Sequence, residues 1–543
     1  MAGIEITSSK QLEAGNGAHL ETTRSDTTNA AIAQDAYLAT EDEHTMTFWQ
    51  AVKRYRKACF WSAIVSCTII MDGYDTALLG SLQAFPAFKY QFGHRVGDTS
   101  DYQVNAKWQV ALGVTNPLGN MFGILFNSVC TERFGHKKTL LVTLFFLCGI
   151  IFITFFSKSI EVLFVGELLS GFAWGVFTTM APAYASEVCP VVLRSYLETF
   201  VVLCWGIGQF VSYGILSAYS HKPQTSYWSW RIPVAIQWVW PVIIFPIVLF
   251  APESPWWLIR KDRIEEAKQS LRRLTNEDEG KVKQATALMI HTNNLEKAMG
   301  EETGIMECFR GTNLRRTEIA CVIWSMQQWG GFVITGYATY FYEQAGLVPT
   351  QAFNFSVGQG GLHFLCTLAA FFLTGRIGRR PLVFWGMSAM SVCMFVIGFI
   401  ALASPSSAQG YSESAVYLLW YCFYELTIGP VAYIIVGEVS TTRLRSHTVG
   451  LARNAYNIAC IINSVVGPYI LNPTEGNWKG KCGFLTGGLI VFCIIWTWFR
   501  LPETGGRTYE ELDILFARKV KARDFKNETV NIVGEETKEV IPH

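Results

Sequence analysis

The fold is decided by a stretch that occurs twice, SEVCPVVLR at residues 186–194 and GEVSTTRLR at residues 437–445. In both copies the glutamate, Glu187 or Glu438, precedes the final arginine by seven residues, and the second copy follows 251 residues after the first. Self-similarity at a fixed long offset is the sequence signature of a duplicated structural unit. The stretch therefore predicts two halves with the same internal plan.

Two shorter charged signatures repeat in the same order. RFGHK at 133–137 returns as RIGRR at 376–380, and PES at 252–254 returns as PET at 502–504. Their offsets, 243 and 250 residues, are close to that of the first pair, and all three signatures lie between long apolar runs. We therefore expect a membrane protein of two similar halves, which is the plan of a carrier that alternates around a central site.

Composition places the chain among membrane proteins. Half of its 543 residues are hydrophobic and only 16% are charged, whereas soluble proteins average roughly a quarter charged. The 18 tryptophans suit a chain with two lipid interfaces. The net charge of +1 gives no reason to expect a nucleic-acid partner. The 14 cysteines are scattered without a CxxC pair, which favours small buried side chains over a metal or redox motif.

About twelve apolar runs approach the roughly 20 residues that a bilayer-spanning helix needs. An N-terminal bundle, 58–250, contains runs at 58–80, 107–130, 139–157, 161–184, 195–219 and 231–250. A C-terminal bundle, 316–501, contains runs at 317–342, 352–374, 382–403, 414–437, 447–471 and 483–501. Between them, a polar linker at 251–315 carries an amphipathic helical pattern at 263–274, which we expect at a membrane surface. The predicted fold is all-α, with twelve transmembrane helices in two pseudo-symmetric six-helix bundles.

The distribution of Lys and Arg predicts the orientation. Basic residues gather before the first run, after the second, eighth and tenth runs, and in the linker, whereas the opposite loops are short and poor in basic residues. We therefore expect the linker and the tails, residues 1–57 and 502–543, on the cytoplasmic side. No apolar signal segment opens the chain, so the first transmembrane helix is expected to act as the signal. The sequon at Asn354 adjoins a predicted helix, which disfavours its glycosylation.

Together these motifs resemble the sugar-porter branch of the major facilitator superfamily over residues 58–515. Within that branch, GYDTALLGS at 73–81, ASEVCP at 185–190 and GYATYFYEQAG at 336–346 are most similar to fungal α-glucoside (maltose-type) proton symporters. The resemblance implies the major facilitator fold, a plasma-membrane location and proton-coupled uptake of a sugar by alternating access. The implied partners are the sugar, the proton and the lipid bilayer.

Enzymatic function is not expected, because the chain contains no Walker A, HExxH, GxSxG or zinc-type spacing. We expect no cofactor, no metal and no obligate protein partner. A transporter-like sensor is a further class, but only about 40 residues follow Glu503, whereas sensors of this fold tend to carry long C-terminal extensions.

Two aspartates of the first helix are the candidates for proton coupling. Asp72 and Asp75 lie three residues apart, hence on one helical face, and a carboxylate at membrane depth costs about 2.5–3.5 kcal/mol on insertion scales. The resemblance gives Asp75 the coupling position of the Gly-Tyr-Asp motif. Glu167 stands where many relatives have an arginine that pairs with this aspartate, so Arg453 is the deep basic candidate to replace it. The alternative is structural, with solvated aspartates and with Glu167, Glu425 and Arg453 in interhelical ion pairs.

Amide and aromatic side chains are the candidates for sugar binding. Amides both donate to and accept from hydroxyls, and aromatic faces stack on a pyranose ring. The resemblance places Gln327 and Gln328 at the pair that holds sugar hydroxyls in this branch. The further candidates are Gln209, Tyr337, Tyr433, Asn454, Asn457 and His363. For each polar residue, and for His363 in particular, an interhelical hydrogen bond is the alternative.

Three residues depart from the family pattern. Val202 and Val333 stand where polar residues are usual, and Asn120 stands where α-glucoside permeases usually have an acid. A site built for hydroxyls loses discrimination when its polar groups are removed. These departures keep open a second function, the transport of a less polar metabolite without proton coupling.

The duplicated charges predict a cytoplasmic gate made of two clusters. The expected members are Arg133, Glu187, Arg194 and Glu253 in the first half, and Arg376, Glu438, Arg445 and Glu503 in the second. Salt bridges at partly wet sites contribute about 0–1 kcal/mol each, so a network of weak pairs suits a gate that opens repeatedly. The alternative is that these charges only maintain the orientation of the loops.

Overall fold

The structure is a computed structural model. It describes residues 34–35, 38, 46–95, 102–223, 225–226, 228–299, 305–374, 376–403, 406–441, 444–505, 507 and 509–528. At 191, 192, 194, 195, 198, 295–299, 371, 445, 446, 509 and 510 it describes the backbone alone.

The N-half, residues 46–250, contains a helix at each of the first six predicted runs. These helices are α3 (Arg56–Ser66) with α4 (Thr68–Leu82), α6 (Ala106–Phe134), α7 (His136–Phe155), α8 (Ile160–Val188), α9 (Val191–Tyr219), and α10 (Trp228–Ile236) with α11 (Val239–Val248). A short helix α2 (Phe48–Arg54) precedes them, and α5 (Pro86–Phe92) follows α4. The strands β1 (His94–Arg95) and β2 (Tyr102–Gln103) pair antiparallel, with His94 opposite Gln103.

The C-half, residues 311–501, repeats this plan. Its helices are α15 (Gly311–Trp329) with α16 (Ala338–Gln344), α17 (Pro349–Thr374), α18 (Arg379–Ile400), α19 (Ser407–Leu426) with α20 (Ile428–Val439), α21 (Arg445–Leu471) and α22 (Cys482–Arg500). A 3₁₀ turn, η3 (Lys479–Lys481), precedes α22, and α23 (Tyr509–Ala517) follows it. The linker between the halves forms α12 (Pro255–Arg260), α13 (Ile264–Leu274), α14 (Glu279–Met299) and η2 (Ile305–Phe309).

Nine helical segments among the described residues are long and apolar enough to cross a membrane. They cover every predicted run except the second, seventh and eleventh, which correspond to α6, to α15 with α16, and to α21. These helices are less apolar because protein covers much of their surface: α21 packs against both α6 and α15. The chain is therefore an integral, multi-pass membrane protein.

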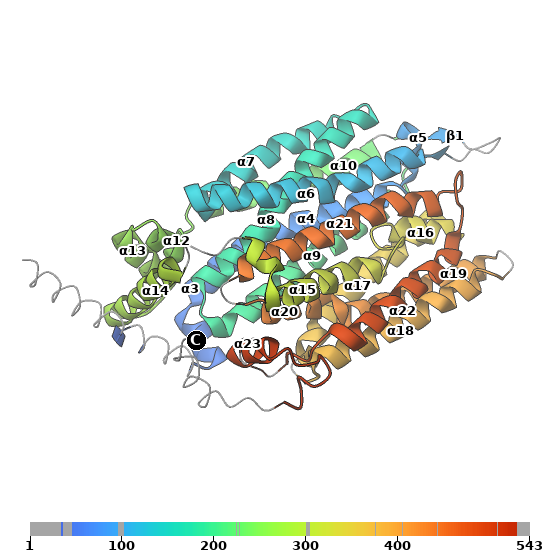
Figure 1. Cartoon of the computed structure of the whole chain (residues 1–543). Coiled ribbons are helices and arrows are strands. Elements are labelled where there is room, and N and C mark those ends of the chain that lie inside the picture. Colours follow the sequence, from blue (N-terminus) through green and yellow to red (C-terminus); the bar gives the residue numbers. More distant parts are fainter. Residues whose placement is uncertain are drawn as a thin grey trace, which may run out of the picture.

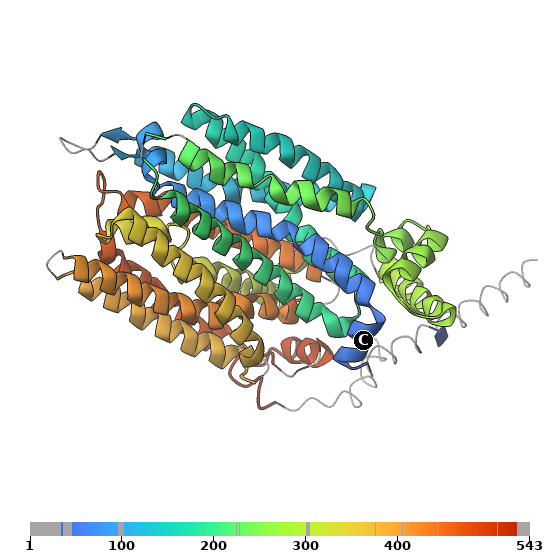
Figure 2. The same cartoon turned by 180° about the vertical axis from the view of Figure 1, so that it is seen from behind.

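The two halves lie side by side, the N-half blue to green and the C-half yellow to red (Figures 1 and 2). They meet where α6 packs against α21 and α9 against α17. Helices α12–α14 lie at one end of the bundle, here called the linker end, and α5 and β1 lie at the opposite end, the far end (Figure 1).

Close contact between α4 and α9 depends on glycine. A Cβ on Gly73 would collide with the backbone oxygen of Trp205, and one on Gly208 would collide with that of Ile70. Small residues let membrane helices approach until their backbones touch. This contact fixes how α4, the helix that carries the two aspartates, lies against α9.

The amphipathic linker helix exists, but its apolar side faces protein. Ala267, Leu271 and Leu274 of α13 are each at most 5% exposed, and α13 packs against α3, α12 and α14. The apolar residues of α13 are therefore buried by packing within the protein, and contact with a membrane surface is not needed to explain them. The fourteen cysteines are free thiols, all buried or half-buried, as expected for small core side chains.

Candidate functional site

Asp75 of α4 is held by two neutral donors. Its carboxyl is 2% exposed and accepts a hydrogen bond from Trp174 Nε1 at 2.8 Å and from Gln237 Nε2 at 2.7 Å. Trp174 belongs to α8, and Gln237 lies in the break between α10 and α11. Three membrane segments of the N-half therefore converge on this carboxyl, and neither donor brings a positive charge.

A second carboxyl lies near Asp75. Glu167 is 3% exposed, and it precedes Trp174 by seven residues, which places both side chains on one face of α8. Glu167 is within electrostatic range of Asp75, and its Oε2 has no hydrogen-bond partner among the described residues. The resemblance would place an arginine at position 167. In this chain the position instead places a second acid near Asp75. Within the described contacts of Asp75 there is no cation.

Asp72 faces the C-half. Its carboxyl is close enough to the side chains of Asn116 on α6 and Trp205 on α9 to interact with them, and it interacts electrostatically with Arg453 of α21. The Arg453 guanidinium lies over the ring of Tyr456, 4.8 Å from its centroid. The two aspartates, which the sequence grouped together, thus differ: Arg453 of the other half interacts with Asp72, whereas no cation among the described residues does so with Asp75.

The Gln-Gln pair of α15 is tied to neighbouring helices of its own half. Gln327 Nε2 donates to the backbone oxygen of Gly429 at 2.7 Å, beside the break between α19 and α20. Gln328 Nε2 donates to Tyr456 Oη at 2.8 Å. Both side chains are buried, at 3% and 6% exposed. Gln328 thereby joins the cluster that contains Arg453.

Tyr433 is the most open of the predicted aromatic candidates. It is 41% exposed, and its ring meets Trp324 edge-on at 5.2 Å between centroids. Asn454, next to Arg453 on α21, and Gln209 of α9 each keep a buried side-chain oxygen without a hydrogen-bond partner among the described residues. These residues could accept hydroxyl donors from a ligand.

Three other predicted candidates lie in contacts between elements. Tyr337, at the start of α16, is 5% exposed and donates to the backbone oxygen of Ser464 at 3.5 Å. Asn457 donates to Asn120 Oδ1 at 3.2 Å, which links α21 to α6 across the halves. His363 of α17 contacts Glu425 and Tyr421 of α19, each at 2.9 Å from its Nδ1.

Of the residues that depart from the family pattern, Val333 has the most unusual geometry. It lies in the break between α15 and α16 with φ of 75°, a left-handed conformation that is strained for a β-branched residue. Asn463 of α21 braces the break, because its Oδ1 accepts from Val333 N at 2.7 Å and its Nδ2 donates to Thr335 O at 3.2 Å. The Val333 side chain is fully buried, whereas Val202 on α9 is half-buried.

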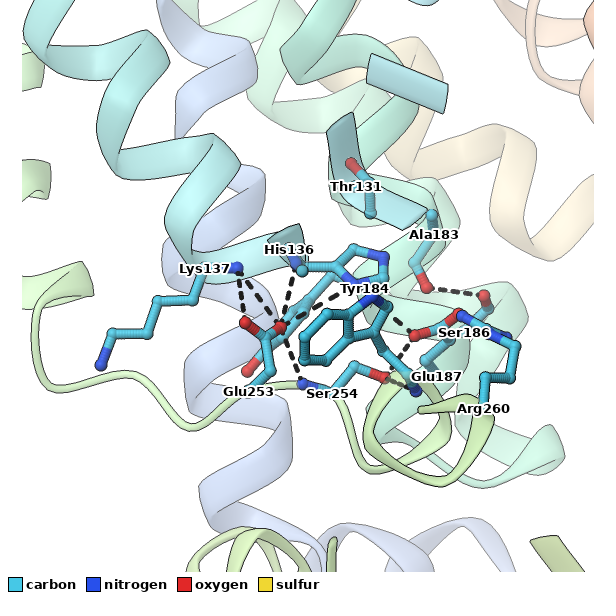
Figure 3. A network of polar contacts seen from close by, with 12 residues as sticks. Thr131, His136, Lys137, Ala183, Tyr184, Ser186, Glu187, Glu253, Ser254 and Arg260 are labelled. Carbon is cyan, nitrogen blue, oxygen red and sulfur yellow. Dashed lines mark hydrogen bonds and ion pairs between the residues drawn. The ribbon is translucent and has the colours of Figure 1, made fainter. Parts of the chain in front are cut away.

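The first cluster of duplicated charges lies at the linker end of the N-half (Figure 3). Glu253 accepts from the backbone N–H groups of His136, at 3.0 Å, and Lys137, at 3.2 Å, and so caps the start of α7. Glu187 pairs with Arg260 Nη2 at 2.7 Å and accepts a hydrogen bond from the Ser254 hydroxyl. A carboxylate at a helix N-terminus is favoured by the unpaired N–H groups and by the helix dipole.

The second cluster repeats this arrangement in the C-half. Glu503 accepts from the backbone N–H groups of Arg379, at 2.8 Å, and Arg380, at 3.2 Å, at the start of α18. Glu438 pairs with Arg379 Nη2 at 2.9 Å and accepts from the Thr504 hydroxyl at 2.6 Å. The internal symmetry inferred from sequence therefore extends to individual hydrogen bonds.

The arginines of these clusters are partly different from those expected. Arg133 and Arg376 are exposed, and among the described residues neither pairs with a cluster carboxylate. Arg260 and Arg379 make these pairs instead. The side chains of Arg194 and Arg445 lie outside the described residues. Arg260 could have been found from the sequence, because it lies two helical turns after PES, in the helix that Ser254 caps by accepting from Trp257 N at 3.2 Å.

Sequence reasoning missed the contacts that close the far end. Lys89 of α5 pairs with Glu343 of α16, with its Nζ 2.5 and 2.6 Å from the two carboxylate oxygens. Asn472 of the C-half donates to Gln109 Oε1 of the N-half at 3.0 Å. Within the described parts of the chain, the hydrogen bonds and ion pair between the halves lie at the far end or at mid-depth. The far end is therefore closed in this conformation.

Comparison with known proteins gives consistent matches. A family model described as "Sugar (and other) transporter" matches residues 61–516. The general alpha-glucoside permease of Saccharomyces cerevisiae is 38% identical over 505 residues, which cover 92% of this chain and 82% of that permease. A maltose permease of the same yeast is 38% identical over 503 residues, with the same two coverages.

Solved structures agree on the fold. The proton:xylose symporter XylE, a major facilitator protein bound to 6-bromo-6-deoxy-D-glucose, superposes with a TM-score of 0.67 at 19% identity. The match covers 85% of this chain and 100% of that one. The inward-open xylose transporter from Escherichia coli gives a TM-score of 0.66 at 19% identity, over 84% and 98% of the two chains.

Proposed function

Since the chain belongs to the sugar (and other) transporter family, and is a membrane transporter and not an enzyme, we propose that it takes up an α-glucoside together with a proton. The sugar class is supported by the alpha-glucoside and maltose permeases that match 92% of the chain. Proton coupling is supported by the surroundings of one carboxyl.

The observation that carries proton coupling is the setting of Asp75. The carboxyl is buried, its hydrogen-bond donors are a neutral indole and a neutral amide, and the described charged groups that interact with it are two other acids, Glu167 and Asp72. An isolated ionised carboxylate is costly to bury, and two neighbouring carboxylates that are both ionised repel each other. A bound proton removes both costs, so Asp75 and Glu167 form the proton-binding site in this proposal.

Asp72 has a different role in this proposal. The opposite charges of Asp72 and Arg453 offset each other without a proton, and their attraction acts between α4 and α21 across the halves. Separation of the two charges weakens this attraction, so opening on either side is sensitive to what occupies the space beside Arg453. A sugar held by Gln328, Tyr433 and Asn454 would lie in that region. Its binding would therefore change the interaction between Arg453 and Asp72 of α4.

In this proposal, alternating access uses the two ends of the molecule, which differ in their contacts. We place the linker end in the cytoplasm, as the Lys/Arg distribution predicts, and the far end outside, in the plasma membrane. The capped clusters at the linker end keep α7 and α18 attached to the linker and to the segment after α22, and we propose that they guide rigid movement of each half. The ion pair at the far end holds the outer side shut in the described conformation.

The test is uptake in a host that lacks sugar transporters, with labelled maltose and glucose at pH 5 and pH 7.5. The proposal predicts saturable, acid-stimulated maltose accumulation. Asp75→Asn should abolish accumulation against a gradient and leave equilibrium exchange. If no sugar shows saturable uptake and a less polar solute does, the alternative suggested by Val202, Val333 and Asn120 replaces this proposal.

A further inference from the structure

A histidine and a glutamate form a buried ion pair on the C-half side of the interface. His363 Nδ1 lies 2.9 Å from Glu425 Oε1 and 2.9 Å from Tyr421 Oη, and the two charged side chains are 1% and 4% exposed. This pair joins α17 to α19 within two of the helices that are long and apolar enough to cross a membrane. It is separate from the carboxyls of the N-half.

Helix α9 of the N-half closes directly over this pair. A Cβ on Gly206 would collide with the His363 imidazole, and the Trp205 ring lies 5.8 Å from it. His363 Nε2 is buried and has no hydrogen-bond partner among the described residues. The side chain of the same Trp205 also interacts with Asp72. The pair is therefore covered by the backbone of the opposite half, and Trp205 neighbours both the pair and Asp72.

No second cation balances Glu425 among the described groups that surround it. The titratable side chains that interact with Glu425 are Cys366 on α17 and Tyr417, Tyr421 and Tyr424 on α19, and Tyr213 of α9 lies behind two of these tyrosines. Thiols and phenols of this kind are neutral near pH 7. The charge of the site is therefore set by His363 and Glu425 alone.

The number of protons on the pair decides whether it can be buried at low cost. With one titratable proton the pair is neutral, either as imidazolium and carboxylate or as imidazole and carboxylic acid. With none it carries a net charge of −1, and with two it carries +1. Burial of an uncompensated charge costs several kcal/mol in proteins, so closure of α9 over the pair is favoured in the state that holds one proton.

We propose that His363 and Glu425 form a second proton-binding site, and that α9 closes on α17 only when this pair holds one proton. The inference rests on the proposed transport function for its role in the cycle, because closure of the halves is a step of alternating access. The site itself does not depend on the identity of the sugar. Imidazole is suited to the task because its proton exchanges near physiological pH.

The experiment measures closure without substrate. Purified protein is incubated in deuterated buffer from pH 5 to pH 8.5, and amide exchange is followed in peptides from α9 and α17 after correction for the intrinsic pH dependence of exchange. The wild type should lose protection in these peptides as the pH rises. Glu413→Gln, a change at another buried glutamate of α19, should leave this pH dependence unaltered.

Variants of the two partners should respond in opposite directions. In Glu425→Gln the neutral imidazole needs no proton, so protection should be lost as the pH falls and His363 becomes charged. In His363→Gln the carboxyl must take the proton itself, and protection should be lost as the pH rises, with a midpoint shifted to lower pH than in the wild type. The reason is that a carboxyl group is a weaker base than imidazole. The double variant, His363→Gln with Glu425→Gln, should show no pH dependence.

A structural hydrogen bond would give another result. Loss of protection in both single variants, with the pH dependence still of wild-type sign and midpoint, would overturn the proposal, as would an unchanged pH dependence in the double variant. If one single variant does not fold, the other and the double variant still decide between the two results. Maltose uptake by Asp75→Asn is read separately, so failure of the proposed function and failure of the second proton site are distinguishable.

Discussion

Replacement of Lys89 by methionine tests whether the far-end ion pair holds the outer side shut. The Lys89 ammonium is 6% exposed, the Glu343 carboxylate is 17% exposed, and they join α5 of the N-half to α16 of the C-half. Methionine keeps most of the length of the side chain and removes the charge. When the far end opens, water reaches both groups, so the pair stabilises the closed state specifically.

The expected magnitude follows from burial. Removal of one partner of a buried ion pair costs about 3–5 kcal/mol, because the other charge loses the attraction that offset its burial. The lower value, about 3 kcal/mol, applies here because Glu343 retains some access to water. Since each 1.4 kcal/mol is a factor of ten, the ratio of open to closed far end should rise about 100-fold in Lys89→Met.

Amide hydrogen exchange of peptides 83–93 and 337–346 measures this ratio, because exchange of a locally protected amide reports the population of the open state. Exchange should rise by up to about 100-fold in Lys89→Met. It should remain unchanged in Lys107→Met, a matched change at an exposed lysine of the same end. The charge-reversed pair, Lys89→Glu with Glu343→Lys, should recover most of the protection. A rise below about threefold in Lys89→Met would refute the reasoning.

Three further changes have defined outcomes. Gly206→Ala puts a Cβ into the His363 ring and should lower the maximal rate of maltose uptake at least tenfold at equal membrane amounts, whereas Gly214→Ala, which meets open space, should not. Equal rates in the two variants would contradict the close approach of α9. Glu503→Gln weakens the cap of α18 and should lower the free energy of unfolding by about 1 kcal/mol, measured as thermal stability in detergent; unchanged stability would remove this role. Gln328→Ala should raise KM for maltose about tenfold, and a change in the maximal rate alone would exclude contact with the sugar.

The repeated signatures were sufficient to predict the two halves, and the apolar runs between them predicted the helices. Each predicted membrane run corresponds to one helix or to a pair of helices, because a run of apolar residues is a local property of the sequence. The breaks were not predictable in the same way. The break between α15 and α16 depends on a strained Val333, which Asn463 of a distant helix holds in place, and no local pattern signals such support.

The candidate site was predicted in part. The sequence singled out Asp72, Asp75 and Arg453, but it could not assign Arg453 to Asp72, because that pairing depends on how α4 and α21 meet across the halves. His363 was grouped with the sugar-binding candidates, although its Nδ1 lies against Glu425. In both cases the residue types were visible in the sequence, and the partners were set by tertiary packing.

The measurement that tests the central claim most directly is simultaneous recording of labelled maltose uptake and of external pH in cells that express the wild type or Asp75→Asn. The account predicts that maltose addition alkalinises the medium around wild-type cells and that the sugar accumulates. It predicts neither effect for Asp75→Asn, which should still exchange maltose across the membrane at equilibrium. Accumulation of maltose with proton uptake by Asp75→Asn cells, or uptake by the wild type without alkalinisation, would contradict the account.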